Sequence, residues 1–322
     1  MNSQIWTLRL SGNLYSSTAN FRNSWRFLHR SCFKLADHGK KPDTNEVNLV
    51  SPSGVLQEAP RSYGKDISEY IPKPLDRPIG LPKPPNPGEN TGIDARTWRE
   101  WRDDLVDYDK HLVRRRQLTS KLATPYFREW KNMRFSKGKT FLAPLRLFRS
   151  NKALYFPNFF GQTLHLDKKM RDTTPVLKNK ISILSVYSSA WGEKQAASFV
   201  SKEMHPELHG IINNSGSLAQ LVSINFEENS LKAMLIKLFM RSLRKRLGEE
   251  NWGRYFLVQK GLTIEIREMI GLLNSKVGYI YLLDDQCKIR WAGSGFSEED
   301  ERMSLLKGVK KLIEERSKSN SA

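Results

Sequence analysis

The chain has 322 residues and a formal net charge of +19, with 53 lysines and arginines against 34 acidic residues. A charge of this sign suits a negatively charged partner, such as nucleic acid, an anionic membrane surface or an acidic protein face, and it does not choose among them. Only Cys32 and Cys287 are present, which excludes a disulfide scaffold and a CxxC redox or zinc motif. No apolar run approaches the roughly 18 residues needed to cross a bilayer, so an integral membrane protein is not expected.

The first 36 residues contain no acidic residue, while five arginines and lysines are spread among serines. This composition is typical of a mitochondrial transit peptide, and the apolar residues from Ile5 to Leu14 could form one face of an amphipathic helix. A disordered basic tail is the alternative. Removal of residues 1–36 would take Cys32 with it and leave Cys287 as the only thiol of the mature protein.

Residues 37–91 contain ten of the fifteen prolines. Proline lacks the amide hydrogen that helices and interior strands need, so this stretch is predicted to be an extended, semi-rigid linker of polyproline type. A docking site for a proline-reading module is the alternative interpretation.

Residues 92–152 are predicted to form a basic helical arm. Trp98, Trp101, Leu105 and Tyr108 recur at helical spacing, with Asp94 placed to cap the start. Thirteen lysines and arginines then stand between positions 110 and 152 against a single acid, and aromatic residues are interleaved with them. Such a stretch suits a solvated basic face, an anionic bilayer surface or stacked nucleotides, and no nucleic-acid motif accompanies it.

Residues 153–322 are predicted to form an α/β domain with a mixed sheet. The apolar, β-branched run from Ile181 to Tyr187 fits a buried strand. Ser188 and Ser189 are expected to cap the helix that follows, and Leu218–Phe226 to form the return strand. Because a helical crossover joins them, the two strands should be parallel neighbours.

The rest of this domain shows further strand and helix patterns. Residues 163–166 alternate as a short edge strand does, and residues 255–258, 277–283 and 289–292 are predicted strands, the last two paired as a hairpin. A helix over 263–273 and a final helix capped by Ser297 are also expected. Residues 231–243 place leucine, methionine and phenylalanine at helical spacing with lysine and arginine between them, so we expect the apolar stripe to pack on the sheet and the basic face to meet solvent.

Three motifs in this domain carry a family resemblance: FPNFFGQTL from Phe156, RDTTPVL from Arg171 and KISILSVYSSAWGEKQAASF from Lys180. They resemble the motifs of the mitochondrial ATP synthase assembly factor family, a fungal chaperone that acts on the Fo membrane sector, and the likeness runs from about Tyr126 to the end. The resemblance implies a thioredoxin-like fold and newly made Fo subunit a as client. Together with the missing transmembrane run and the basic aromatic arm, this leads us to expect peripheral attachment at the matrix side of the mitochondrial inner membrane, with no nucleic-acid partner.

The sequence shows no catalytic constellation. Redox enzymes of the thioredoxin type place a low-pKa cysteine where this chain has Ser188–Trp191, and a proline where it has Asn274–Lys276. No histidine adjoins the serines to activate them. His205 and His209 lack metal-site spacing, and Pro206 makes a helix between them doubtful. We therefore expect no enzyme activity, no cofactor and no metal.

Two rival functions stay open. A thiol peroxidase or reductase could use Cys287, which is expected to be an exposed thiol in a turn beside Lys288. A basic mitochondrial RNA-binding or ribosome-binding protein could use residues 110–152, with an affinity that falls steeply with salt.

The candidate partner contacts follow from these motifs. Trp191 is expected to be exposed by its place in the turn, although packing over the end of the sheet is an equal alternative. The other candidates come from the same turn, from the first motif and from the arm: Ser188, Ser189, Phe156, Asn158 and Trp130.

Overall fold

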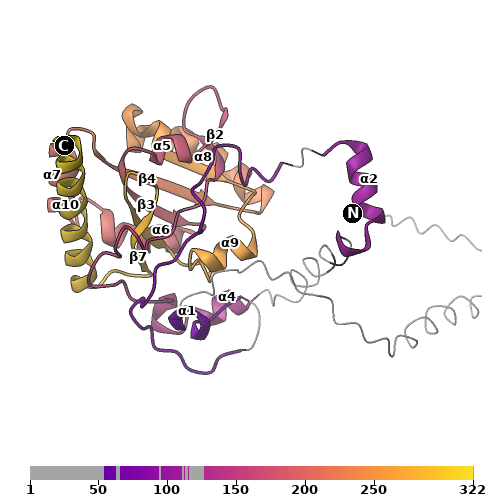
Figure 1. Ribbon diagram of the computed structural model, residues 1–322, viewed down its shortest axis with the longest axis horizontal. Helices are drawn as coiled ribbons and strands as arrows, with labels where there is room; N and C mark the ends of the chain where they lie inside the picture. Colours follow the sequence, from indigo (N-terminus) through magenta and orange to yellow (C-terminus); the bar gives the residue numbers. More distant parts are fainter. Residues whose placement is uncertain are drawn as a thin grey trace, which may run out of the picture. The chain divides into compact units, whose positions relative to one another are not determined.

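The computed structural model describes residues 54–62, 66–93, 96–110, 112, 115 and 127–321, which belong to one compact unit (Figure 1). The predicted transit peptide of residues 1–36 lies outside the described residues. So do residues 37–53 of the predicted linker and 116–126 of the predicted arm.

The domain is built on a seven-stranded mixed sheet with the order β2-β1-β5-β4-β3-β6-β7. Its strands are β1 (Phe160–Thr163), β2 (Met170–Asp172), β3 (Ile181–Tyr187), β4 (Ala219–Phe226), β5 (Tyr255–Val258), β6 (Tyr279–Leu283) and β7 (Ile289–Ser294). β4 is parallel to β3 and to β5, and the remaining pairs are antiparallel. The predicted parallel crossover and the predicted hairpin are both confirmed.

Helices follow the strands in the predicted order. From β2 onward they are α5 (Thr174–Leu177), α6 (Ala190–Val200), α7 (Pro206–Asn214), α8 (Ser230–Leu247), the 3-10 helix η2 (Glu249–Arg254), α9 (Ile264–Met269) and α10 (Glu299–Ser321). The unit β3–α6–β4, then the β6–β7 hairpin, then α10, with the strand order β4-β3-β6-β7, is the arrangement of the thioredoxin-like fold. The fold class expected from the sequence is confirmed.

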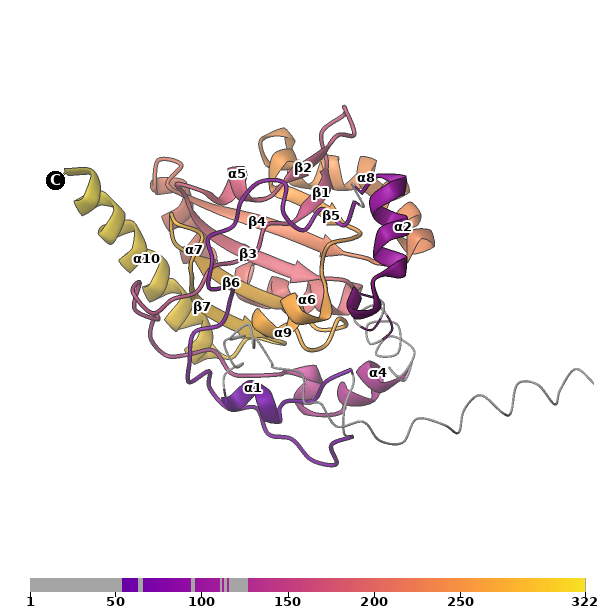
Figure 2. The ribbon, with the colours of Figure 1, turned by 45° about the vertical axis from the view of Figure 1, so that its right-hand side comes forward.

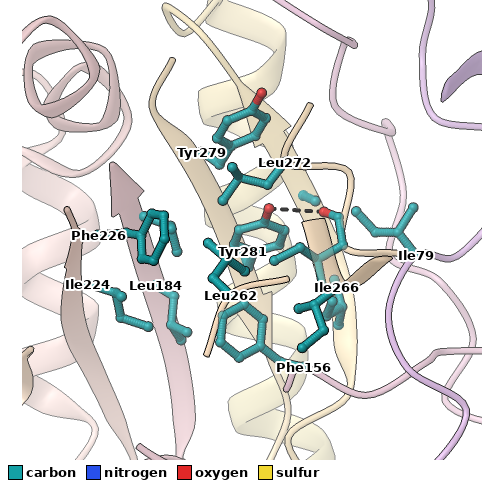
Figure 3. Packing of buried hydrophobic residues seen from close by; sticks show 14 of the residues in the cluster. Ile79, Phe156, Leu184, Ile224, Phe226, Leu262, Ile266, Leu272, Tyr279 and Tyr281 are labelled. Atoms are coloured by element: carbon teal, nitrogen blue, oxygen red, sulfur yellow. Dashed lines mark hydrogen bonds between the residues drawn. The ribbon is translucent and has the colours of Figure 1, made fainter. Parts of the chain in front are cut away.

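The sheet is covered on both faces. Alternate residues of β5 divide between them, because Phe256 and Val258 face one core while Tyr255 and Leu257 face the other. The first core contains Phe156, which packs near Tyr281 (Figure 3). The Tyr281 hydroxyl donates to the Ile270 carbonyl at 2.9 Å, and this bond is the dashed line drawn at Tyr281. On the second face α10 lies beside α7 and packs over β6 and β7, and α8 lies next to β1 and β5 (Figures 1 and 2).

Part of the predicted proline-rich linker belongs to this domain. α1 (Gly54–Glu58) places Leu56 in the first core, and Leu75 and Ile79 are buried there too. The backbones of Leu81 and Tyr155 exchange two hydrogen bonds, at 2.7 and 2.8 Å. The prolines do forbid regular helix and interior strand over residues 66–91, but the extended chain lies along the domain and buries the apolar residues between them, so it is not a spacer.

The predicted basic arm is not one long helix. α2 (Trp98–Val106) begins with a capping box between Thr97 and Glu100, and Asp94, the predicted cap, lies outside the described residues. α4 (Arg128–Asn132) and the 3-10 helix η1 (Ser136–Gly138) are short, and the chain then enters the core at Phe141. The domain therefore begins before residue 153, because residues 139–143 supply buried side chains.

Of the predicted apolar stripe of α8, only Leu243 packs toward the sheet; the other five residues face away from it, which corrects the sequence interpretation. Ala233 and Met240 are the buried residues, with Ile236, Leu243 and Leu247 packed partly beside them. These five residues also recur at threes and fours, so the helix carries two apolar stripes and periodicity alone could not choose between them. The small Ala233 side chain allows the second stripe to approach the sheet.

Candidate functional site

The start of α6, where β3 ends, carries the two predicted serines. The Ser189 hydroxyl accepts from the Gly192 amide at 2.9 Å and donates to the Lys276 carbonyl at 2.9 Å, so it caps the helix as predicted. Ser188 is not a cap, because its hydroxyl donates to the Ser275 carbonyl instead. Both serines therefore bind the loop that precedes β6.

This loop and the first turn of α6 are in direct backbone contact. A Cβ atom added at Gly278 would lie 2.1 Å from the Gly192 carbonyl oxygen, so only glycine fits there. The buried Gln195 side chain accepts from the Gly278 amide and donates to the Lys137 carbonyl, each at 2.9 Å. The start of α6 is thus closed by the loop.

The acidic partner of this loop comes from α4. Glu129 accepts from the Ser275 amide at 3.0 Å and from the Ser275 hydroxyl at 2.5 Å, and its carboxylate lies 3.7 Å from the Lys276 ammonium. Ser188 and Ser189 each donate to a carbonyl oxygen, which cannot remove a proton. These contacts order the loop, and among the three serines only Ser275 donates its hydroxyl to a carboxylate.

Two tryptophans stand exposed around this junction. Trp191 is 41% exposed, as expected from its place in the turn, and its ring makes an edge-to-face contact with Phe296, with ring centroids 5.3 Å apart. Trp130 is 51% exposed, and the Lys276 ammonium lies 6.0 Å from its ring centroid. We call Trp130, Trp191, Lys276 and Phe296 the α6 rim.

Phe156 and Asn158 do not belong to this rim, which corrects their prediction as contacts. The Phe156 side chain is fully buried between Phe159 and Tyr281. Asn158 is fully buried too, and its amide donates to the Glu89 carbonyl at 2.9 Å and to Asp172 at 2.7 Å. Asn158 therefore joins the proline-rich segment to β2.

Cys287 is buried rather than exposed, and its thiol belongs to the first core. Burial, with Asp284 adding to it, raises the pKa of this thiol to about 12. The thiol therefore stays protonated at neutral pH, and a thiolate is what nucleophilic or redox chemistry requires.

His205 and His209 belong to the region of α7. α7 does form, with Pro206 in its first turn where a missing amide hydrogen costs nothing, so the expected helix break is wrong. His205 precedes the helix, and the His209 ring lies 2.7 Å from the Val200 carbonyl oxygen. Within the part of the chain that the structure describes, no group of three metal-ligating side chains occurs. The same described residues include no helix with the length and apolar character to span a bilayer.

A second candidate surface was missed by the sequence interpretation. Five large apolar residues of α8 are exposed, and we call them the α8 outer face: Leu231, Met234, Leu235, Leu238 and Phe239. The sequence did contain a signal for it, namely the second apolar stripe through Ala233 and Met240. Because only one stripe can pack on the sheet, two stripes on one helix indicate that the other is exposed.

The strand order defines a thioredoxin-like domain. At the start of its first crossover helix, α6, this domain has the capping residue Ser189 and no cysteine. A sequence profile of the ATP10 protein family matches residues 58–312. The chain belongs to this family, which confirms the resemblance noted in the motifs.

Individual relatives agree with the profile. Mitochondrial ATPase complex subunit ATP10 of Candida glabrata is 31% identical over 249 residues, covering 77% of this chain and 88% of that protein. The Saccharomyces cerevisiae protein of the same name is 28% identical over 257 residues, covering 76% and 88%.

Solved structures give weaker likenesses. A DsbF homologue from Corynebacterium diphtheriae is 17% identical with a TM-score of 0.33, covering 52% of this chain and 90% of its own. A secreted thiol-disulfide isomerase from Corynebacterium glutamicum is 14% identical with a TM-score of 0.35, covering 55% and 99%. The fold class rests on the strand order and directions described above.

Proposed function

We propose that this protein is a non-catalytic chaperone for assembly of the mitochondrial ATP synthase, which binds newly made subunit a of the Fo sector. The observation that carries the proposal is the family match over residues 58–312, which spans most of the described domain, together with relatives named as mitochondrial ATPase complex subunits. Subunit a is the client that the motif resemblance implies.

A role without catalysis is supported by the chemistry of the domain. The serines at the start of α6 donate to carbonyl oxygens, and the Cys287 thiol is buried with a raised pKa. Neither group is prepared for attack on a substrate. The exposed tryptophans of the α6 rim lie on a rigid junction instead, and aromatic side chains of this kind dominate protein recognition.

The place of action that fits is the matrix face of the mitochondrial inner membrane, with peripheral attachment. The relatives are named as mitochondrial proteins, and the net charge, which is still +14 without the five cations of residues 1–36, favours an anionic surface. An unassembled polytopic client sits in the same membrane and carries buried polar groups that need partners. A chaperone that binds it lowers the population open to proteolysis.

Pulse labelling of organellar translation products tests this function. In mitochondria that lack the protein, subunit a should be made at a normal rate and then decay quickly, while the F1 sector stays active. Reduced synthesis of several organellar products together would overturn the proposal, because an RNA-binding or ribosomal role acts at that earlier step. Turnover of thiol substrates by the purified protein would equally contradict it.

A further inference from the structure

The α8 outer face is an unusual surface for a soluble domain. Its five side chains are exposed over two turns and more of one helix, by 74% for Leu231, 59% for Met234, 54% for Leu235, 65% for Leu238 and 65% for Phe239. Exposed apolar residues scattered singly need no explanation, but a contiguous stripe marks an interaction site.

The helix does not need this stripe in order to fold. Its other side packs through Ala233 and Met240 onto a small core formed with Leu164, Tyr255 and Leu257. Asn229 caps its first turn, accepting from two backbone amides at 3.0 and 3.3 Å. α8 is therefore held in place from beneath, and its outer face is available to a partner.

The charges on α8 indicate the kind of partner. Residues 230–247 include six lysines and arginines and no acidic residue, while glutamates stand only at the two ends, at 227, 228, 249 and 250. Arg246 pairs with Glu193 at 2.9 Å, and Arg244 donates to the Leu164 carbonyl. Among the described residues, the structure gives no acidic partner to the four remaining cations, which are exposed: Lys232, Lys237, Arg241 and Lys245.

The positions of these charges matter as much as their number. In an α-helix, residues three, four and seven apart share a side, so Lys237, Arg241 and Lys245 continue along the outer half of α8 beside and beyond the apolar stripe. The outward side is thus apolar toward the helix start and basic toward its end. A helix with leucine, methionine and phenylalanine on one stripe and lysine and arginine at its borders has the composition of helices that lie in the bilayer interface.

We propose that the α8 outer face binds the surface of an anionic lipid bilayer, with its apolar stripe at the depth of the acyl-chain boundary and its cations among the headgroups. The long lysine and arginine stems allow the charges to reach the headgroup layer while the helix lies flat. A second copy of the chain suits this face less well, because each copy would bring four cations without acidic partners of their own, and residues 230–247 contain no acidic residue. This inference rests on the proposed function for the membrane concerned, and lipid binding itself needs no client.

A site-specific probe tests the contact. Cys32→Ser with Ser242→Cys in the full chain gives one reactive thiol on the outer half of α8, because Cys287 is buried. An environment-sensitive fluorophore at this position should shift to the blue with phosphatidylcholine vesicles that contain phosphatidylglycerol, and much less with phosphatidylcholine alone. The same fluorophore at Lys310→Cys, an exposed site on α10, should not shift.

Binding measurements on matched variants complete the test. Leu235→Gln with Leu238→Gln, and separately Lys237→Gln with Arg241→Gln and Lys245→Gln, should each lower the partition coefficient onto anionic vesicles at least about tenfold. Lys307→Gln with Lys310→Gln and Lys311→Gln on α10 removes the same charge and should change it less than about twofold. Unchanged thermal unfolding of the variants shows that each is folded.

Each remaining outcome overturns the inference in a different way. Equal losses in the α8 and α10 charge variants would mean a nonspecific charge effect, and unchanged binding of both α8 variants would assign lipid contact to another basic segment. Normal lipid binding with loss of subunit a binding in the α8 variants would make the face a protein-docking site. The lipid contact is tested by vesicle binding alone, and the chaperone role is tested by the half-life of subunit a. Each of the two proposals can therefore fail while the other holds.

Discussion

The ammonium nitrogen of Lys139 lies 2.6 Å from Oε2 of Glu301, and both side chains are 5% exposed. The same ammonium donates to the Phe296 carbonyl at 2.7 Å, and Oε1 of Glu301 accepts from the Ala143 amide at 2.8 Å. One cation of the supposedly solvated basic arm is therefore a buried connection between residues 139–143 and α10.

Replacing this cation should destabilise the domain strongly. Lys139→Met leaves the Glu301 carboxylate buried without its counter-ion, and loss of one partner of a buried ion pair costs about 3–5 kcal/mol. Lys152→Met, at an exposed position of the same basic stretch, should change the unfolding free energy by less than about 0.5 kcal/mol. Urea unfolding of the two variants checks this difference, and equal midpoints would show that the ion pair is not buried in solution.

The thiol of Cys287 should be almost unreactive in the folded protein. In a Cys32→Ser background, a disulfide reagent at neutral pH should modify Cys287 only as fast as the domain opens, and at once in denaturant. The reason is burial, which also raises the pKa of this thiol to about 12. Rapid modification of the folded chain would revive the thiol enzyme interpretation.

The raised pKa also predicts a dependence of stability on pH. The unfolded thiol ionises near about 8.5, so above that pH the unfolded chain loses a proton that the folded chain keeps. The unfolding free energy should fall as pH rises from about 8.5 toward 10, below the range in which the buried tyrosines contribute. Cys287→Ala should flatten this slope. Cys287→Ser is a poorer control, because it places a hydroxyl in an apolar core at a cost of about 1–3 kcal/mol.

The junction between α6 and the loop before β6 should tolerate no added side chain at Gly278. Gly278→Ala forces a methyl group to within 2.1 Å of the Gly192 carbonyl oxygen unless the backbones separate. We expect a loss of stability above about 2 kcal/mol, as for other overpacked cores. Gly210→Ala on α7 is the control, since nothing lies within 4 Å of its added Cβ and alanine favours a helix by roughly 0.5–1 kcal/mol. Thermal unfolding that ranks the two variants the other way would contradict the contact.

The elements around β3 could be predicted because their signals are local. Seven buried residues, a serine turn and a run of good helix formers determine β3 and α6 through neighbours in sequence. The α6 rim was predicted in part for the same reason. The exposure of Trp191 could be expected because this residue lies in the first turn of the helix that Ser189 caps. Phe296 could not be linked to it, because that contact joins residues about a hundred positions apart.

Contacts between distant residues decided what the sequence could not. Asn158 and Phe156 lie in a motif that invites a functional interpretation, and only the structure shows that both are enclosed by the domain. Leu75 and Ile79 lie among prolines that exclude regular structure but not burial. For α8 the choice between two apolar stripes depended on which stripe fits the surface of β1 and β5. The spacing of apolar residues along the helix carries no information about that surface.

The last prediction concerns recognition at the α6 rim. Trp191→Ala removes a half-exposed ring whose edge-to-face contact with Phe296 stabilises the domain by only about 0.5–1.5 kcal/mol. The domain should therefore stay folded, while the proposed contact with subunit a is weakened. Met204→Ala, at a residue that is 53% exposed on the approach to α7, is the control for loss of an exposed apolar side chain.

The measurement is the half-life of newly labelled subunit a in mitochondria that carry each variant in place of the unaltered chain. We expect faster decay with Trp191→Ala than with Met204→Ala at equal levels of the two proteins. Phe156→Ala should also hasten the decay of subunit a, but for a different reason. Loss of this core side chain should lower the unfolding free energy by about 3–5 kcal/mol, and the level of the protein itself should fall. If subunit a decays equally slowly with Trp191→Ala and Met204→Ala, then Trp191 is not the contact and the rim serves only to hold the loop before β6 against α6.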